Sequence, residues 1–478
     1  MLMYIKLSLL GGMLWATSAL AQSDQAFVEQ TIEQQQASTI KLAQSMWNWA
    51  ELGFQEYKSS QMMQDMLSRA GFTIRNGVAD MPTAFIASYG SAGPVIGILA
   101  EMDALPGLSQ QALPEKSAIA GKVAGHACGH HLFAGGSVAA AIAIKKWLVA
   151  TGTAGQVRLF GTPAEEGGSG KVYMVRAGLF DDVDLALHWH AGDNNSAVAM
   201  TSLANKSAKF RFKGIASHAA AAPERGRSAL DAVEAMNYMV NMMREHVPSD
   251  SRIHYIITNG GSAPNIVPEF AEVYYYVRSP SAETVIDLWK RLEKTAKAAA
   301  LGTETEVEWE VVGGAWDLLP NLTLAKSMSE SLAKFGGLSY SAEEQAFADK
   351  LRPTLGARGE AGKGNEQQVF AFTNNILAIT ASTDVGDVSW QIPTAGLSTA
   401  TWVPGTPPHS WQAVAAGGTS IGNQGMLLAA KALALSAITL YSQPGLIEQA
   451  KLEFKQRKGN TAYYPLIEDR QPALDYRK

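Results

Sequence analysis

Gly125-His126-Ala127-Cys128-Gly129-His130-His131 holds the only cysteine of the chain and three of its nine histidines. A thiolate and imidazoles this close together are the donors that a transition metal prefers. The glycines allow a tight bend, which would bring Cys128 and His130 toward one centre. A buried thiol beside surface histidines is the alternative interpretation. The stretch predicts a metal site only if further ligands occur elsewhere.

Two adjacent carboxylates are the next candidates. Glu165 and Glu166 follow the apolar run of residues 157–160, which we predict to be a buried strand. Successive side chains of an extended segment point to opposite sides. One carboxylate can therefore bind a metal while its neighbour moves protons. A solvated pair of glutamates is the alternative for this motif taken alone.

Imidazoles complete the set. His188 and His190 end another apolar run, and His409 lies in a Pro-rich loop late in the chain. A single histidine of this kind is more often structural than a ligand. Because open α/β sheets place their sites at strand ends, the clusters together predict one metal centre.

Composition narrows the class of protein. The chain has 478 residues, 47% of them hydrophobic, which is enough for a packed core and more than one domain. A net charge of -5 without a basic stripe argues against a nucleic-acid partner. The single cysteine cannot form an internal disulfide, so metal ligation would also protect it in an oxidising compartment.

The first 21 residues are typical of an export signal. Lys6 precedes the apolar run of residues 7–15, and Ala19-Leu20-Ala21 offers a cleavage site. The run is short for a membrane span, and we expect no second run of spanning length. We therefore predict an exported protein, periplasmic or extracellular, without a stable membrane anchor.

Alternating strand and helix patterns predict an α/β fold. Residues 25–70 have the spacing of two amphipathic helices, residues 94–100 are a strand that leads to Glu101 and Asp103, and residues 137–150 are a helix. Asp103 is placed to orient a metal ligand, with a turn cap as the alternative.

A second unit interrupts this fold. From about residue 206 the pattern is strand, helix, two strands, helix, strand, which predicts a small α+β satellite domain. We predict a catalytic domain in two parts, residues 22–205 and 322–478, around a satellite of residues 206–321. In the last part we expect a helix at 322–335, a mobile loop at 355–367, core strands at 376–380 and 397–402, and a helix at 424–440.

Taken in order, these motifs resemble the aminoacylase/carboxypeptidase G superfamily of di-metal amidohydrolases, and within it the bacterial p-aminobenzoyl-glutamate hydrolase B subunits. The resemblance covers about residues 47–443. Its motifs are Gly129-His130, Pro163-Ala164-Glu165-Glu166-Gly167-Gly168-Ser169-Gly170, His218-Ala219-Ala220, Gly226-Arg227-Ser228-Ala229-Leu230-Asp231-Ala232, Ala263-Pro264-Asn265-Ile266-Val267-Pro268, Ala381-Ser382-Thr383-Asp384-Val385-Gly386-Asp387-Val388-Ser389-Trp390 and the His409 loop. It implies a mixed-sheet, zinc-peptidase-like catalytic domain with an inserted satellite for dimerisation.

The resemblance also implies roles. Two divalent ions, zinc or manganese, would be bound by Cys128, His130, Glu166, His190 and His409. Glu165 would be the general base toward a metal-activated water, and His218 would stabilise the oxyanion in the site of a partner subunit. Asn265 and Arg278 would contact the substrate, although Arg278 could instead form a surface ion pair.

Two positions need separate expectations. His131 stands where relatives commonly carry Asp or Asn, so we expect the support of the metal site to differ there. The spacing from residues 182–184 favours His190 over His188 as the ligand.

The implied reaction is hydrolysis of an amide between an acyl or aroyl group and an amino acid, with p-aminobenzoyl-glutamate-like substrates first. A dipeptidase or an N-acyl or indole-acetyl-amino acid hydrolase is the enzymatic alternative. Outside enzymes, an exported metal-binding dimeric scaffold would keep the ligands but would not need Glu165. The implied partner is a second copy of the chain, with a homologous second subunit as the alternative.

Overall fold

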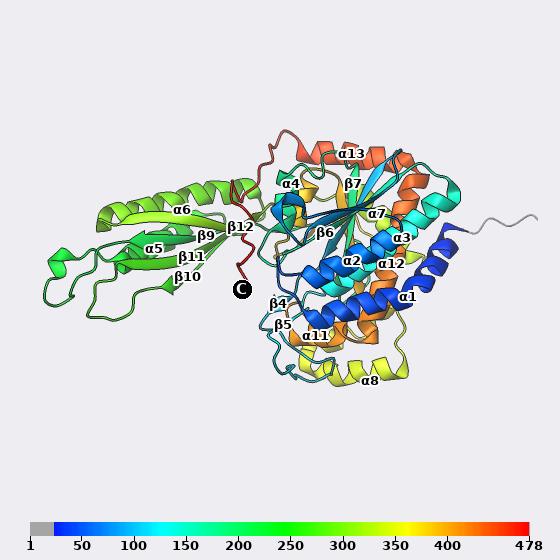
Figure 1. Cartoon of the computed structure of the whole chain (residues 1–478), viewed down its shortest axis with the longest axis horizontal. Helices are drawn as coiled ribbons and strands as arrows, with labels where there is room; N and C mark the ends of the chain where they lie inside the picture. The colour runs from blue at the N-terminus through cyan, green and yellow to red at the C-terminus, as the bar shows by residue number, and fades with distance from the viewer. Residues whose placement is uncertain (1–22, 478) are drawn as a thin grey trace, which may run out of the picture.

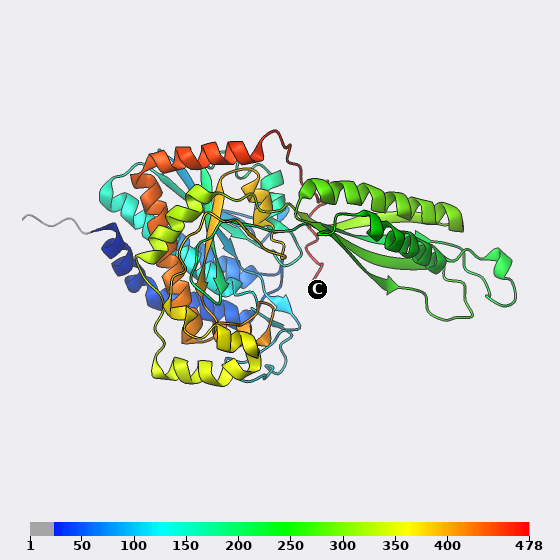
Figure 2. The ribbon, with the colours of Figure 1, turned by 180° about the vertical axis from the view of Figure 1, so that it is seen from behind.

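The computed structural model describes residues 23–477, so the predicted signal peptide lies outside the described residues. A large α/β body and an elongated satellite make up the described chain (Figure 1). The satellite projects from the body in the opposite view as well (Figure 2).

The sheet of the body has six strands in the order β1-β2-β6-β3-β7-β14. Their bounds are β1 Thr73–Asn76, β2 Phe85–Tyr89, β3 Val95–Glu101, β6 Gln156–Thr162, β7 Leu185–Gly192 and β14 Thr394–Ala400. The pairs β1–β2 and β2–β6 are antiparallel, whereas the pairs β6–β3, β3–β7 and β7–β14 are parallel. Every residue of β3 is buried, as expected of a central parallel strand. The predicted mixed sheet is confirmed.

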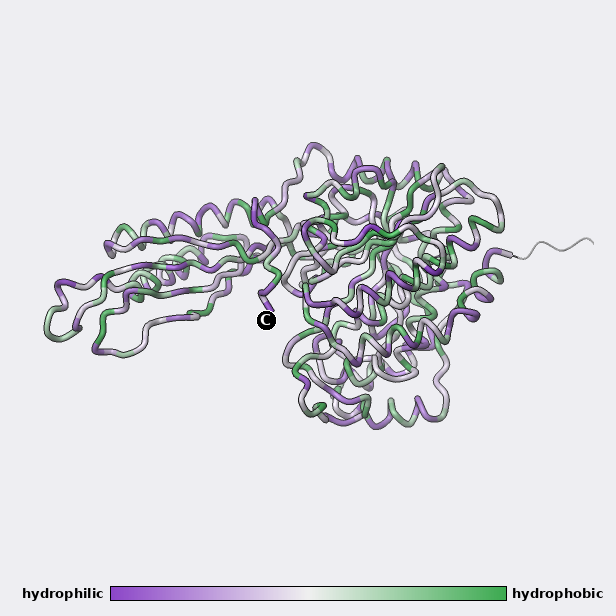
Figure 3. The backbone as a smooth tube through the Cα atoms, viewed as in Figure 1, coloured by the Kyte–Doolittle hydropathy of each residue, from purple (hydrophilic) through white to green (hydrophobic). Residues whose placement is uncertain are grey.

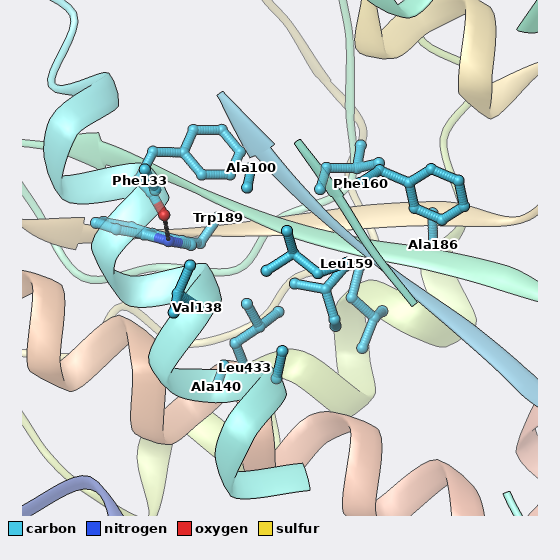
Figure 4. Packing of buried hydrophobic residues seen from close by; sticks show 14 of the residues in the cluster. Ala100, Phe133, Val138, Ala140, Leu159, Phe160, Ala186, Trp189 and Leu433 are labelled. Carbon is cyan, nitrogen blue, oxygen red and sulfur yellow. Dashed lines mark hydrogen bonds between the residues drawn. The ribbon is translucent and has the colours of Figure 1, made fainter. Parts of the chain in front are cut away.

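Helices cover this sheet in layers. They are α1 Asp24–Trp49, α2 Tyr57–Arg69, α3 His130–Thr151 and α12 Ser420–Ser442. α3 contacts β3, β6 and β7, α12 contacts β7 and β14, and α1 lies against α3 and α12. In the core, the indole Nε1 of Trp189 donates to the carbonyl of Phe133 at 3.1 Å (Figure 4). The most hydrophobic segments gather in this sheet (Figure 3).

α3 and α12 are each long and apolar enough to cross a membrane by length and composition. Our expectation that no further apolar run of spanning length occurs is therefore wrong. However, 83% and 78% of their most apolar windows are buried inside the protein. Burial in the core accounts for their composition.

The satellite is a four-stranded antiparallel sheet in the order β10-β11-β9-β12. Its elements follow the predicted order: β9 Ala204–Lys213, α5 Ala229–Met243, β10 Arg252–Asn259, β11 Phe270–Ser279, α6 Ala282–Thr303 and β12 Glu306–Ala315. α5 and α6 pack on β9 and β11. Burial alternates along β11 because only one face of the sheet is covered by helices.

β9 begins and β12 ends next to the body, and Lys213 pairs with Glu306 and Phe270 at the far end of the satellite. This register decides which satellite residues can reach the body of their own chain.

The remaining elements are mostly short. They are β4 Leu105–Pro106, β5 Ala124–Gly125, α4 Gly170–Arg176, β8 Met200–Thr201, α7 Leu322–Ala333, α8 Ala342–Leu351, α9 Ala357–Ala361, β13 Leu377–Ala378, α10 Val385–Ser389, α11 Trp411–Gly417 and α13 Pro444–Lys458, with 3-10 turns at Val78–Asp80, Pro223–Arg225, Arg244–His246, Arg352–Leu355 and Asn365–Gln367.

Two expectations for this part are wrong. Residues 355–367 are not a structureless loop, because they form α9 and a 3-10 turn in which Gly359 and Glu366 are buried. The expected core strand at 376–380 is the two-residue β13, which is exposed and pairs with β8 outside the main sheet. The main sheet ends at β14 and does not include this run, so local apolar content misled the prediction.

Candidate metal centre

The carboxyl ends of β3, β6 and β7 bring the predicted side chains to one edge of the sheet. Glu101 is the last residue of β3, and Asp103 follows two residues later. Glu165 and Glu166 follow β6, and His190 lies near the end of β7. These strands are parallel, so segments far apart in the sequence meet where open α/β sheets place their sites.

Cys128, His130 and His190 form one group. Their candidate ligand atoms lie within 4.8 Å of one another, with Cys128 Sγ 3.6 Å from His190 Nε2. Gly129 precedes α3 with φ +77°, and a Cβ there would lie 2.4 Å from Cβ of Ala191. Only glycine fits this bend, as the sequence indicates.

Glu166 and His409 form a second group with Cys128. His409 Nε2 is 3.0 Å from Glu166 Oε1. The backbone N–H of His409 donates to the carbonyl of Ala127 at 2.9 Å, which ties the Pro-rich loop to the cysteine loop. The His409 side chain is 52% exposed, so it forms the open side of the centre.

Glu101, His130 and Glu165 form a third group. His130 lies between two carboxylates, with Nε2 3.0 Å from Glu101 Oε2 and Nδ1 3.0 Å from Asp103 Oδ1. The other oxygen of Asp103 accepts from the backbone N–H of Glu166 at 2.9 Å. Asp103 thus contacts one predicted ligand and the backbone of another.

Three buried atoms at this edge, Glu101 Oε2, His130 Nε2 and Glu166 Oε1, have close ion-pair contacts but make no hydrogen bond among the described residues. Leaving such groups unsatisfied is costly, whereas a cation shared between them would satisfy all three. The thiol and imidazoles suit zinc, and the carboxylates also suit manganese. The residues present therefore fit divalent metal ions.

A buried charge network supports the centre from behind. The ammonium of Lys171, whose side chain is fully buried, lies 2.7 Å from Glu101 Oε1 and 2.6 Å from Asp384 Oδ1. Burial raises the pKa of Glu101, but the charges of Lys171 and His130 outweigh it and hold that pKa well below its ordinary value. Glu101 is therefore an anion in the folded protein.

Burial, followed by the charges of Glu101 and Glu166, holds the pKa of Glu165 well above its ordinary value. Burial lowers the pKa of His190 and favours its neutral imidazole. Because His190 Nδ1 lies 2.8 Å from the carbonyl of Ala191, Nδ1 carries the proton, and the lone pair of Nε2 faces Cys128. A lone pair in this position is what metal ligation requires.

His188 and His131 lie outside the three groups. The His188 ring stacks on Phe133 with centroids 6.4 Å apart and occupies the space beside Gly396. His131 Nε2 contacts the carbonyl of Gly417 at 3.0 Å, which links α3 to α11. His131 thus contributes to helix packing, and the metal centre receives its support from Asp103 and Glu101.

His218 and Asn265 lie together at the far end of the satellite, beyond Lys213. His218 bridges to Ile266, and the N–H of Ala219 donates to the carbonyl of Asn265 at 3.0 Å. Across β9 the distance from the body is about 30 Å at the usual rise per residue. The chain's own metal centre is out of reach of both side chains.

Arg278 lies at the opposite end, where it pairs with Asn205 and Arg252 next to the body. Its guanidinium stacks over Tyr276 at 5.3 Å, and its Nε is buried without a hydrogen-bond partner in the described chain. No salt bridge of Arg278 occurs within residues 23–477. Within one chain, therefore, Asn265 and Arg278 are far apart.

Sequence reasoning assigned no role to Glu101, Lys171 or Asp384. Glu101 and Asp103 are two residues apart after a strand, so alternation could have placed them on one side. Asp384 lies in the motif of residues 381–390, which indicated only the family resemblance. Nothing in the sequence indicates that Lys171 is buried.

Comparison with known proteins shows which families this chain resembles. A family model described as a peptidase dimerisation domain matches residues 204–304. The chain is 42% identical to the B component of p-aminobenzoyl-glutamate hydrolase from Escherichia coli over 92% of this chain and 96% of the relative. It is 30% identical to the Xaa-Arg dipeptidase of Mus musculus over 87% and 88% of the two chains.

A solved structure shows the same fold. It is a dinuclear metal-binding peptidase of the M20 family from Bacillus subtilis, with a TM-score of 0.58 at 17% identity over 86% of this chain and 99% of that one. The chain belongs to the M20 family of metal-dependent amide hydrolases, in the branch of the p-aminobenzoyl-glutamate hydrolase B subunits.

Proposed function

We propose that this protein hydrolyses the amide bond between an aroyl or acyl group and an amino acid, with p-aminobenzoyl-glutamate as the first substrate to test. One observation carries the proposal: Cys128, His130, Glu166, His190 and His409 gather at one sheet edge with Glu165 beside them. The 42% identity to the B component of the Escherichia coli hydrolase supports the choice of substrate.

Two divalent ions, zinc or manganese, held by these five residues would supply Lewis-acid polarisation of the amide carbonyl and an acidified water. Glu165 is half-buried and adjacent to Glu166 in sequence, but it belongs to a different ligand group. It accepts the proton of the attacking water and delivers it to the leaving nitrogen. Asp103 orients His130 and holds the backbone of Glu166.

The active form in this proposal is a dimer in which each satellite serves the partner's centre. His218 Nδ1 accepts hydrogen bonds from the N–H groups of Ala220 and Ala221, at 3.2 and 3.1 Å. The proton of the imidazole is therefore on Nε2, which is free to donate to an oxyanion. Asn265 accompanies it, while Arg278 stays next to the body of its own chain. A homologous second subunit in place of the second copy is the alternative assembly.

A substrate panel with metal analysis tests the reaction. The purified protein is assayed with p-aminobenzoyl-glutamate, acyl-amino acids and dipeptides, beside Glu165→Ala and the exposed control Glu330→Ala. We expect turnover by the wild type and Glu330→Ala, and a loss of at least about 1000-fold in Glu165→Ala with metals still bound. Full turnover by Glu165→Ala would eliminate the proposed base.

The dipeptidase alternative is supported by the 30% identity to an Xaa-Arg dipeptidase. In the same panel, a kcat/KM for dipeptides above that for p-aminobenzoyl-glutamate would select it. Metal binding without turnover of any substrate would select the scaffold function.

Export belongs to the proposal because residues 1–21 have the composition of a cleavable signal. Expression of the full chain followed by cell fractionation and N-terminal sequencing tests it. We expect the processed protein to begin at Gln22, outside the cytoplasm, whereas an intact Met1 in the cytoplasm would contradict export.

A further inference from the structure

A strap of residues 463–477 follows α13 and passes between the two bodies (Figure 1). It begins on the satellite, where Leu466 is buried in the satellite core. The indole Nε1 of Trp316 donates to the carbonyl of Tyr464 at 2.8 Å. These contacts fix the first half of the strap at the junction of the bodies.

The middle of the strap binds both bodies. Arg470 donates through Nη1 to the carbonyl of Val312 on β12 and pairs with Glu310 at 3.2 Å. On the side of the body, Arg176 donates to the carbonyls of Glu468 and Arg470, each at 2.8 Å. The strap therefore spans the junction rather than lying on one domain.

The last described residues of the strap reach the candidate centre. The hydroxyl of Tyr476 donates to the backbone carbonyl of Glu166 at 3.0 Å, and Nη2 of Arg477 donates to the same oxygen at 2.7 Å. The Tyr476 ring packs edge-on against the buried Phe54, with centroids 5.7 Å apart. Two donors thus occupy both lone pairs of one carbonyl.

The turn that receives these donors has an unusual backbone. Ala164 and Ser169 have φ of +55° and +59°, a region that residues other than glycine rarely adopt. Such a conformation persists only when its surroundings determine it. From inside, Glu56 Oε1 accepts the N–H of Ala164 and Asp103 Oδ2 accepts the N–H of Glu166, each at 2.9 Å.

We propose that Tyr476 and Arg477 are positioning residues that fix the Glu165–Glu166 turn from the outside, opposite Asp103. The inference rests on the proposed function, because it takes Glu165 as base and Glu166 as ligand. The N–H of Glu166 is held by the body and its carbonyl by the strap, so the peptide planes on both sides of the residue are fixed. These planes set the directions in which the Cα–Cβ bonds of Glu165 and Glu166 leave the backbone, from which the two carboxylates extend.

The expected effect is on the chemical step. Neither strap residue is a candidate metal ligand, so loss of their hydrogen bonds removes no ligand but lets the turn that carries Glu165 and Glu166 move. Misplacement of reacting groups by about 1 Å typically costs about 100-fold in rate. Turnover falls while KM changes little, since the lost interaction is not with the substrate.

The test compares a double variant, Tyr476→Phe with Arg477→Gln, with a matched double control. The control is Tyr464→Phe with Arg69→Gln, which changes the same residue types at an exposed strap position and on the surface of α2. For the test variant we expect a kcat at least about tenfold lower with KM within about twofold. Amide exchange in residues 163–170 should be at least about fivefold faster, because an opening of the turn exposes its N–H groups.

Three further results decide the inference. A Zn²⁺ titration should show weaker binding in the test variant, because Glu166 is a ligand on the mobile turn, and unchanged binding in the control. Arg477→Lys, which keeps a donor of similar reach, should recover part of kcat. Wild-type kcat, Zn²⁺ affinity and amide exchange in a folded test variant would overturn the positioning role.

Failure of the proposed function gives a different pattern. If the wild type turns over no substrate in the panel, or Glu165→Ala keeps its activity, the function fails. Amide exchange and the Zn²⁺ titration still report on the strap in that case. If the strap variant has wild-type kcat, Zn²⁺ affinity and amide exchange while Glu165→Ala is inactive, only the positioning role of Tyr476 and Arg477 is overturned.

Discussion

Paired variants of Glu165 and His218 test whether each active site is built from two chains. Glu165 belongs to the metal centre of its own body, and His218 lies about 30 Å away at the far end of the satellite, beyond the ten residues of β9. The perturbation is therefore Glu165→Ala in one protomer and His218→Ala in its partner.

The single variants set the baseline. Loss of one oxyanion donor costs about 3–4 kcal/mol of barrier, so His218→Ala should lower kcat about 100- to 1000-fold. The fold of the variant should be unaffected, because His218 is exposed and its ring nitrogen bonds only local backbone. Glu165→Ala should lower kcat at least as far.

The mixed dimer should recover activity. One of its two sites combines an intact Glu165 with an intact His218 from the partner, while the other site lacks both. A symmetric dimer with one working site of two has about half the wild-type activity. The reversed pair, a wild-type protomer with a Glu165→Ala/His218→Ala protomer, has one defect in each site and should be nearly inactive.

Co-expression with two affinity tags and sequential purification gives each heterodimer, and p-aminobenzoyl-glutamate hydrolysis gives kcat per dimer. The two pairings carry the same substitutions, so stability effects cancel. If the reversed pair holds half the activity and the mixed pair none, His218 acts within its own chain and the reasoning from the satellite register is refuted.

Lys171→Met should destabilise the protein by about 3–5 kcal/mol, because two buried carboxylates lose their counter-ion; urea unfolding measures this, and an unchanged midpoint would contradict the buried network. Glu453 accepts hydrogen bonds from the N–H groups of Leu322 and Thr323 at the start of α7. Burial raises the pKa of Glu453, but these N–H groups and Arg457 outweigh burial and hold the pKa below the ordinary value of 4.5. Its contribution, about 1 kcal/mol, is then present above pH 4.5 and lost as the pH falls through the lowered pKa; Glu453→Gln should be less stable than wild type at pH 7 and equal to it in acid, and a difference that does not change with pH counts against the assignment. Dialysis against a chelator should abolish turnover and lower Tm, and zinc or manganese should restore both; activity that survives complete metal removal would contradict a metal-dependent site.

Local sequence patterns correctly predicted several strands and the bend before α3. The buried run of β3 and the alternation along β9 and β11 specify strands because burial on two faces or one face imposes those patterns. Gly129 marked the bend before α3 for a local reason, since its φ of +77° is a conformation that residues with a side chain rarely adopt. Such features depend on few neighbours and are therefore readable in sequence.

Features that depend on distant neighbours were missed. Residues 355–367 carry loop-forming residue types, but they form α9 and a 3-10 turn with buried residues packed against the body. The exposed β13 has the apolar content of a core strand, but the main sheet already ends at β14. Local composition could not indicate which apolar run the core would include.

By itself, the sequence determined the kinds of donor atoms, their order at the ends of separate strands and the strand and helix order of the satellite, because these depend on residue type and spacing. Only the tertiary structure decided that Lys171 neutralises Glu101 from behind and that Asn265 and Arg278 lie at opposite ends of the satellite. It alone placed Tyr476 and Arg477 on the carbonyl of Glu166. The physical reason is that chain spacing constrains side chains within an element, whereas contacts between elements follow from sheet register and the packing of one common core.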